Sequence, residues 1–110
     1  MTHPEHQVVG LDIEAQRALL RNSPVYFERC YAQPIGGGRY AHNLAANLQA
    51  IQALGAASTI LATDAGQVEN LPWDECWAHI FRFLRAAGVS ERELTTMCVT
   101  NPSWLLGLAD

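Results

Sequence analysis

An aspartate stands where an apolar run of this sequence ends and turn-forming residues begin. Residues 60–67 read Ile-Leu-Ala-Thr-Asp-Ala-Gly-Gln, so Asp64 closely follows a stretch typical of a buried β-strand. In α/β folds the carboxyl ends of the strands form the edge where ligands and catalytic groups lie. A carboxylate at this edge could bind a metal ion or take a proton from a water molecule that the ion activates. The same residues could instead form an Asx turn that only ends the strand.

Two histidines near the start of the chain offer imidazole ligands for the same chemistry. His3 and His6 are three residues apart, and imidazole is a common zinc ligand. On one helical turn they could share an ion, and His3 could approach Asp64 if it lies at the same edge of the sheet. Pro4 and the terminal position favour a frayed, solvated segment instead, above all for His6.

The hydrophobic pattern predicts an alternation of helices and strands. Strands are expected over residues 25–31 and 59–63, because both stretches are rich in β-branched, aromatic and aliphatic residues. The order loop, helix, strand, helix, strand, helix, helix favours parallel βα units with right-handed crossovers, in a single domain over residues 1–110. Helices are expected after Asp12, before Gly55, after Pro72 and after Ser90, which opens the capping box Ser-Glu-Arg-Glu.

Side-chain alternation along the first strand places Glu28 and Cys30 on one face and Arg29 on the other. Because Cys30 lies at the end of this predicted strand, it is expected at the same edge as Asp64. A glutamate on that face is either part of a site or exposed, and we favour exposure. The three cysteines are widely spaced, without a Cys-x-x-Cys pair, and we expect them to be small buried residues in a reducing compartment.

Three glycines precede Arg39 and are expected to form a loop. Their backbone N–H groups, with Arg39, could bind an anion at the start of the next helix, although the lysine and the spacing of a P-loop are absent. A flexible connection is the alternative. His42 and His79 are expected within helices, as surface or packed imidazoles.

The composition excludes several classes of protein. With 110 residues, 49% hydrophobic and 16% charged, the chain suits one packed domain. A net charge of −4 and the lack of a basic stripe argue against nucleic-acid binding. The apolar runs are too short to span a bilayer and no signal peptide is evident, so we expect a cytoplasmic protein without a membrane role.

Three stretches of the sequence resemble parts of the amidohydrolase superfamily. Residues 60–67 resemble the eighth strand of its barrels, which ends in a metal- or water-binding aspartate. Residues 88–94, together with Asn101-Pro102 and the Leu-Leu-Gly-Leu of residues 105–108, resemble its closing helices. The opening Thr-His-Pro-Glu is similar to the end of an earlier strand that carries a metal-ligand histidine. The phosphotriesterase-like and TatD-like metal-dependent hydrolases are the nearest groups.

This resemblance implies a partial (β/α)8, TIM-barrel-like unit with two to three parallel strands and covering helices. A whole barrel needs about 250 residues, and the chain resembles only the last βα units. The resemblance implies that His3 and Asp64 bind a divalent metal, zinc or manganese, and that Asp64 is catalytic. The chain has neither a His-x-His pair nor a lysine, so it cannot supply the other ligands of a binuclear site, such as the carboxylated lysine of some members.

We therefore expect a truncated or incomplete metal-dependent hydrolase that is active only when another chain completes it. A non-catalytic α/β association domain and a small anion-binding protein are the alternatives. So few parallel strands leave one face of the sheet bare and its edges unpaired. For this reason we also expect a homo-oligomer or a complex with a complementing chain, rather than a stable monomer.

Overall fold

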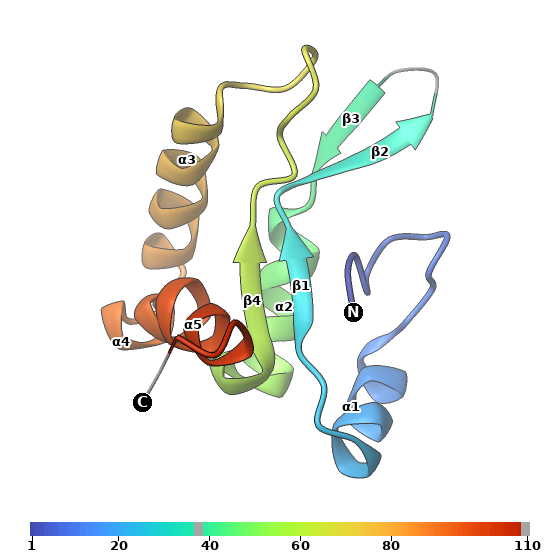
Figure 1. The fold of residues 1–110 in the computed structure, drawn as a ribbon. Helices are drawn as coiled ribbons and strands as arrows, with labels where there is room; N and C mark the ends of the chain where they lie inside the picture. Colours follow the sequence, from blue (N-terminus) through green and yellow to red (C-terminus); the bar gives the residue numbers. More distant parts are fainter. Residues whose placement is uncertain (37–38, 109–110) are drawn as a thin grey trace.

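Two parallel strands form the centre of the protein. The computed structural model describes residues 1–36 and 39–108, and for residues 33–36 and 39–41 it describes only the backbone. Strand β1 (Phe27–Cys30) pairs with β4 (Thr59–Ala62) in parallel. This pairing confirms the expected parallel arrangement. The α/β class is confirmed as well, because the helix α2 (Leu44–Leu54) lies between the two strands in sequence and behind them in space (Figure 1).

A third short segment extends the parallel sheet on the outer side of β1. Thr2 forms a parallel bridge with Glu28. The N–H of His3 donates to the Glu28 carbonyl at 3.0 Å, and the Glu28 N–H donates to the Met1 carbonyl at 2.8 Å. Three parallel segments therefore lie side by side in the order Thr2, β1, β4, which agrees with the predicted two to three parallel strands.

The remaining helices surround this sheet. In Figure 1, α3 runs beside β4, α5 lies in front of the lower part of β4, and α1 lies below β1. A π-helical turn over Thr96–Thr100 joins α4 to α5, so the chain is helical without a break from Glu91 to Leu105. The bounds of these helices are α1 (Ile13–Asn22), α3 (Trp73–Ala86), α4 (Glu91–Thr95) and α5 (Asn101–Leu105).

The predicted helix boundaries are confirmed at the atomic level. The Asp12 carboxylate accepts from the N–H of Ala15 at 2.8 Å and starts α1. Gly55 ends α2 with φ of +89°, a conformation that glycine adopts without strain. Ser90 and Glu93 form the reciprocal hydrogen bonds of a capping box at the start of α4.

An antiparallel hairpin between β1 and α2 was not predicted. Its strands are β2 (Ala32–Gly36) and β3 (Arg39–His42). Gly36 therefore belongs to a strand and not to the expected loop, and His42 lies in a strand and not in a helix. The other two glycines, Gly37 and Gly38, lie outside the described residues. Proline and glycine are disfavoured in strands, so Pro34 and the glycines conceal the strand pattern.

The hydrophobic core lies on one face of the parallel sheet. Leu61 of β4 points into this core, together with Ile51 of α2 and Ile80 of α3. Arg29 of β1 is also fully buried, and burial lowers its pKa to about 10, so the guanidinium stays charged at neutral pH. The buried residues of the core cluster are Tyr31, Ala32, Leu44, Ile51, Leu61, Cys76, Ile80, Leu84, Val89, Leu94 and Met97.

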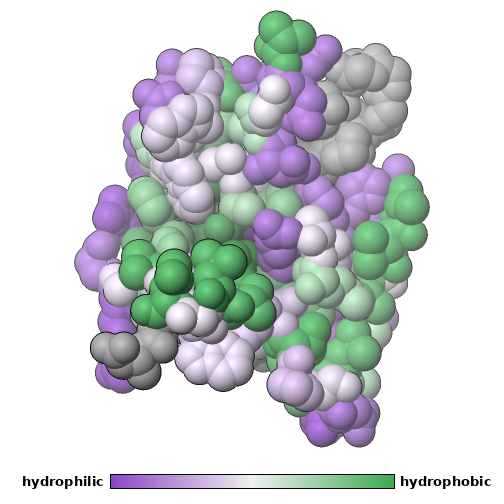
Figure 2. Space-filling model, in the orientation of Figure 1, coloured by the Kyte–Doolittle hydropathy of each residue, from purple (hydrophilic) through white to green (hydrophobic). Residues whose placement is uncertain are grey.

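The opposite face of the sheet is open and largely apolar. A pocket of about 350 Å³ there is lined by Tyr26, Ile60 and Leu106, among others. Next to it, Leu105 at the end of α5 is 57% exposed, and Leu106, the residue that follows α5, is 71% exposed. Figure 2 shows hydrophobic side chains gathered over α5 on this side of the molecule. Among the helices described, none is both long and apolar enough to cross a membrane.

Candidate metal centre

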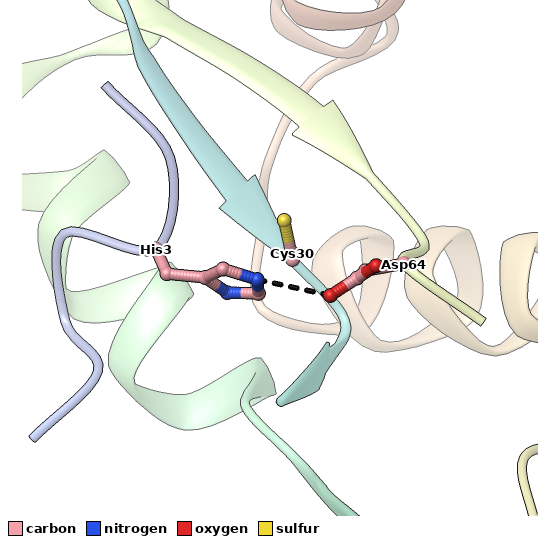
Figure 3. Close-up of side chains that lie close together, drawn as sticks. All are labelled: His3, Cys30 and Asp64. Atoms are coloured by element: carbon pink, nitrogen blue, oxygen red, sulfur yellow. Dashed lines mark hydrogen bonds and ion pairs between the residues drawn. The ribbon is translucent and has the colours of Figure 1, made fainter. Parts of the chain in front are cut away.

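The carboxyl ends of the three parallel segments bring His3, Cys30 and Asp64 together. His3 follows the residue that bridges to β1, Cys30 is the last residue of β1, and Asp64 lies two residues beyond β4. Figure 3 shows His3 and Asp64 pointing toward each other at this edge, with Cys30 beside them, each from a different segment. The edge predicted for Asp64 therefore also holds the predicted ligand His3, although the two residues are 61 positions apart in the sequence.

The ligand atoms of the cluster are close enough to share one ion. His3 Nε2 lies 2.9 Å from Asp64 Oδ2, and one ligand atom from each of the three residues lies within 4.8 Å of the other two. Zinc bonds of about 2.0–2.3 Å place tetrahedral ligands roughly 3.2–3.8 Å apart, so small side-chain movements would suffice. Cys30 is buried, His3 is half-buried and Asp64 is exposed, so the cluster opens to solvent on the aspartate side.

His3 and Asp64 share a strained backbone conformation. Their φ angles are +53° and +48°, and among the described residues no other non-glycine residue has a positive φ. Such left-handed conformations cost energy for residues with a Cβ, and they occur preferentially at functional sites. Here they direct both side chains to the same point above the strand ends.

The thiol of Cys30 is held in its protonated form. Burial raises its pKa to about 12, and the negative charges of Glu28 and Asp64 add to this effect. Without a cation beside it, Cys30 is therefore a poor nucleophile. Glu28 is half-buried and lies outside the ligand cluster, and the Thr2 hydroxyl donates to its Oε2 at 2.5 Å in an exposed hydrogen bond, so the expected exposure is only partial.

The segment that follows His3 is ordered and packed. Pro4 and His6 are buried, and the His6 Nδ1 accepts from the N–H of Val8 at 3.0 Å. The expectation of a frayed, solvated terminus was therefore wrong for His6. The rings of His3 and His6 meet edge to face with centroids 6.0 Å apart, and His6 is not a member of the ligand cluster.

The donor set of the cluster fits zinc. Imidazole nitrogen, thiolate sulfur and carboxylate oxygen are the three donor types that zinc takes in proteins, and three protein ligands leave a fourth position open. His3 Nδ1 is buried and has no hydrogen-bond partner among the described residues. Because the second ring nitrogen of a metal-binding histidine normally has a partner, this atom indicates that the surroundings of the site are incomplete.

A second group of rings lies next to Cys30 in sequence but belongs to a different structure. The Tyr31 hydroxyl and His79 Nδ1 lie 2.8 Å apart, and the Tyr31 ring stacks on His42 with centroids 4.5 Å apart. His42 is exposed at the surface and His79 is half-buried, so the expectation of surface or packed imidazoles is confirmed for both. The group connects the β2–β3 hairpin to α3.

The predicted anion site depends on Gly37, Gly38 and the Arg39 side chain, all of which lie outside the described part of the structure.

Two features of this region were missed from the sequence. Cys30 was placed at the correct edge but not among the ligands, although its position at a strand end was the available signal. The buried ion pair between Arg29 and Glu5 was not predicted, because it joins residues 24 positions apart. No local pattern marks such a pair.

Comparisons with known proteins found no match to this chain. No family model matches the sequence, and neither the curated proteins nor the solved structures contain a match. The resemblance to the amidohydrolase superfamily therefore remains an expectation from the sequence.

Proposed function

We propose that this chain supplies His3, Cys30 and Asp64 to the metal site of a hydrolase that another chain completes. The observation that carries this proposal is the convergence of three ligand atoms, within 4.8 Å of one another, at the carboxyl ends of three parallel segments. This is the edge where α/β proteins bind ligands. The sheet and its helices would then form one arc of a (β/α)8 barrel.

The ligand types favour zinc over manganese. A thiolate suits zinc, whereas manganese prefers oxygen ligands, so Cys30 decides between the two. Zinc bound at this edge would lower the pKa of a water molecule and polarise a carbonyl or phosphoryl oxygen of the substrate. Asp64 is the catalytic residue of the proposal. In the metal-free chain its Oδ2 contacts His3 Nε2. With zinc bound, both side chains would turn to the ion, and the carboxylate oxygen of Asp64 that does not coordinate would accept a proton from the attacking water.

The open face of the sheet supports completion by a second polypeptide, either another copy or a complementing chain. The core covers one face of the parallel sheet, whereas the opposite face, which carries the cluster, is largely apolar and holds a pocket open to solvent. Parallel sheets are normally covered on both faces. Association without chemistry is the second candidate function, because the same apolar face supports it whether or not a metal binds.

Zinc titration of the intact chain tests the proposed site. The protein is purified without chelators, and zinc binding is measured by calorimetry for the wild type, His3→Gln and Asp64→Asn. We expect one zinc per chain, and at least about tenfold weaker binding in each variant because a ligand is lost.

Asp74→Asn is the matched control, since Asp74 is an exposed aspartate in the first turn of α3, outside the cluster. Its zinc affinity should equal that of the wild type. The proposal is contradicted if the wild type binds no zinc, or if Asp64→Asn and Asp74→Asn bind zinc equally well.

A further inference from the structure

The segment that carries His3 is attached to β1 at two places, the edge of the strand and its core face. On one side of His3, the bridge between Thr2 and Glu28 joins the segment to the edge of the strand. On the other side, Glu5 contacts the guanidinium of Arg29. Arg29 points away from the face that holds the cluster, because neighbouring strand residues alternate in direction. The chain therefore passes around the edge of β1 within two residues of His3.

Arg29 is the centre of the second attachment. Its side chain is fully buried, and that of Glu5 is 8% exposed. The Arg29 Nη1 also donates to Gln16 Oε1 at 2.9 Å, which connects the pair to α1. Its Nε donates to Thr59 Oγ1 at 3.2 Å, which connects the pair to β4. Through Arg29, Glu5 is thus connected to three elements of the core, namely β1, α1 and β4.

We infer that the buried Glu5–Arg29 ion pair is a positioning device that holds His3 in place against Asp64. The backbone of His3 is left-handed, with φ of +53°, so its conformation must be maintained by attachments on both sides. The pair provides the attachment on the C-terminal side. The inference rests on the proposed function for its effect on zinc, but the position of the His3 ring is independent of any metal.

The contact between the two charges has only one point. Glu5 Oε2 and Arg29 Nη2 are buried and have no hydrogen-bond partner in the part of the chain described here. The single contact is a charge-assisted hydrogen bond, roughly twice as strong as a neutral one, and among the described residues the only other contact of Glu5 Oε1 is a long one of 3.4 Å from Gln16 Nε2. Glu5→Gln keeps the size of the side chain and one acceptor oxygen but removes the charge. It should therefore weaken the attachment of the segment that carries His3 without leaving a cavity at residue 5.

Ring nitrogen spectra of the histidines test the inference without metal. In Glu5→Gln, we expect the His3 signals to move toward those of a free imidazole, and the contact between the His3 and Cys30 protons to weaken. The signals of His42 and His79 should stay unchanged, because these rings belong to the Tyr31 group. Assignment of His3 comes from the spectrum of His3→Gln.

The control is Glu14→Gln, which removes an exposed glutamate paired with Arg17 on α1. It should leave all histidine signals in place. Unchanged His3 signals in Glu5→Gln would overturn the inference. So would an equal shift of His3, His42 and His79, because that would indicate general loosening and not loss of a local attachment.

A double variant separates positioning from stability. Glu5→Leu combined with Arg29→Met replaces a buried ion pair by apolar side chains, a change that is often neutral for folding. We expect the double variant to fold and yet to bind zinc about tenfold more weakly, as Glu5→Gln does. Zinc affinity equal to that of the wild type would overturn the inference.

The two proposals fail in distinguishable ways. If the wild type binds no zinc but Glu5→Gln still displaces the His3 ring, the proposed function fails and the positioning role stands. If zinc binds through His3 and Asp64 but Glu5→Gln changes neither affinity nor ring signals, the positioning role fails alone.

Discussion

The backbone conformation of Asp64 lowers the stability of the fold. Its φ of +48° belongs to the left-handed region, which aspartate tolerates better than most residues and glycine tolerates best. The same geometry turns the carboxylate back toward His3, 2.9 Å away. Stability and site geometry are therefore in competition at this residue.

Two substitutions at Asp64 should separate these effects. Both Asp64→Ala and Asp64→Gly remove the carboxylate and should abolish zinc binding. Because only glycine relieves the left-handed strain, Asp64→Gly should be more stable than Asp64→Ala by about 1 kcal/mol in urea unfolding. At Asp74, in the first turn of α3, the order should reverse and alanine should be the more stable. An Asp64→Ala variant as stable as Asp64→Gly would contradict this prediction.

At the scale of elements, the capping box of α4 is the clearest case of sequence deciding structure. Ser90 Oγ accepts from the N–H of Glu93 at 3.3 Å, and the Glu93 carboxylate accepts from the Ser90 N–H at 2.8 Å and from its hydroxyl at 2.7 Å. The Ser90 side chain and then its backbone N–H hold the pKa of Glu93 below its usual range. Folding therefore favours the ionised glutamate.

Ser90→Ala should lower the free energy of unfolding by about 1 kcal/mol at neutral pH. Since the pKa of Glu93 is depressed in the folded state, its stabilising effect is complete above the ordinary glutamate pKa. The effect is lost as pH falls through the lower folded-state value. The stability difference between wild type and Ser90→Ala should thus narrow in acid, as measured by urea unfolding at several pH values. A difference that does not change with pH would contradict the capping role of Glu93.

Elements with local signals could be predicted from the sequence, and elements that depend on distant contacts could not. The stripe of Leu44, Leu48 and Ile51 with the stop at Gly55 marks α2 without ambiguity. The β2–β3 hairpin has no such pattern. Strand pairing there overrides the poor strand propensities of Pro34 and Gly36.

The candidate site shows the same division. Asp64 could be found because an apolar run ends at it, and His3 because of its place in the resemblance. The buried position of His6 could not be predicted, because it depends on packing between the first ten residues and the rest of the chain. Cys30 lies beside His3 and Asp64 because β1 pairs with both neighbouring segments, and this pairing could not be predicted from the residues around Cys30.

At the scale of the whole molecule, the sheet is covered unequally. The core side is filled by α2, α3 and α4, whereas the side of the cluster carries the apolar pocket and the exposed Leu105 and Leu106 at the end of α5. Single exposed apolar residues are ordinary on a protein surface, but contiguous ones mark interaction sites. The open face is therefore the surface on which we expect a second copy to bind.

Leu106→Glu should prevent self-association without loss of stability. Leu106 is 71% exposed, so a charge there costs the folded monomer little but disrupts an apolar contact. Sedimentation velocity over a range of concentrations should show oligomers for the wild type and monomers for the variant. Val99→Glu is the matched control, because Val99 is 56% exposed and lines a different pocket, and it should behave as the wild type does. A wild type that remains a cooperatively folding monomer at micromolar concentration would contradict the expectation.

The cluster and the apolar face occupy the same side of one small sheet, with Glu28 at their boundary. Glu28 lines the apolar pocket, and it also raises the pKa of Cys30. A partner that covers this face would desolvate the cluster, and an ion in the cluster would change the charge that the partner meets. If both bind, their binding would be thermodynamically linked, and linkage is reciprocal: the factor by which zinc changes the affinity for the partner equals the factor by which the partner changes the affinity for zinc.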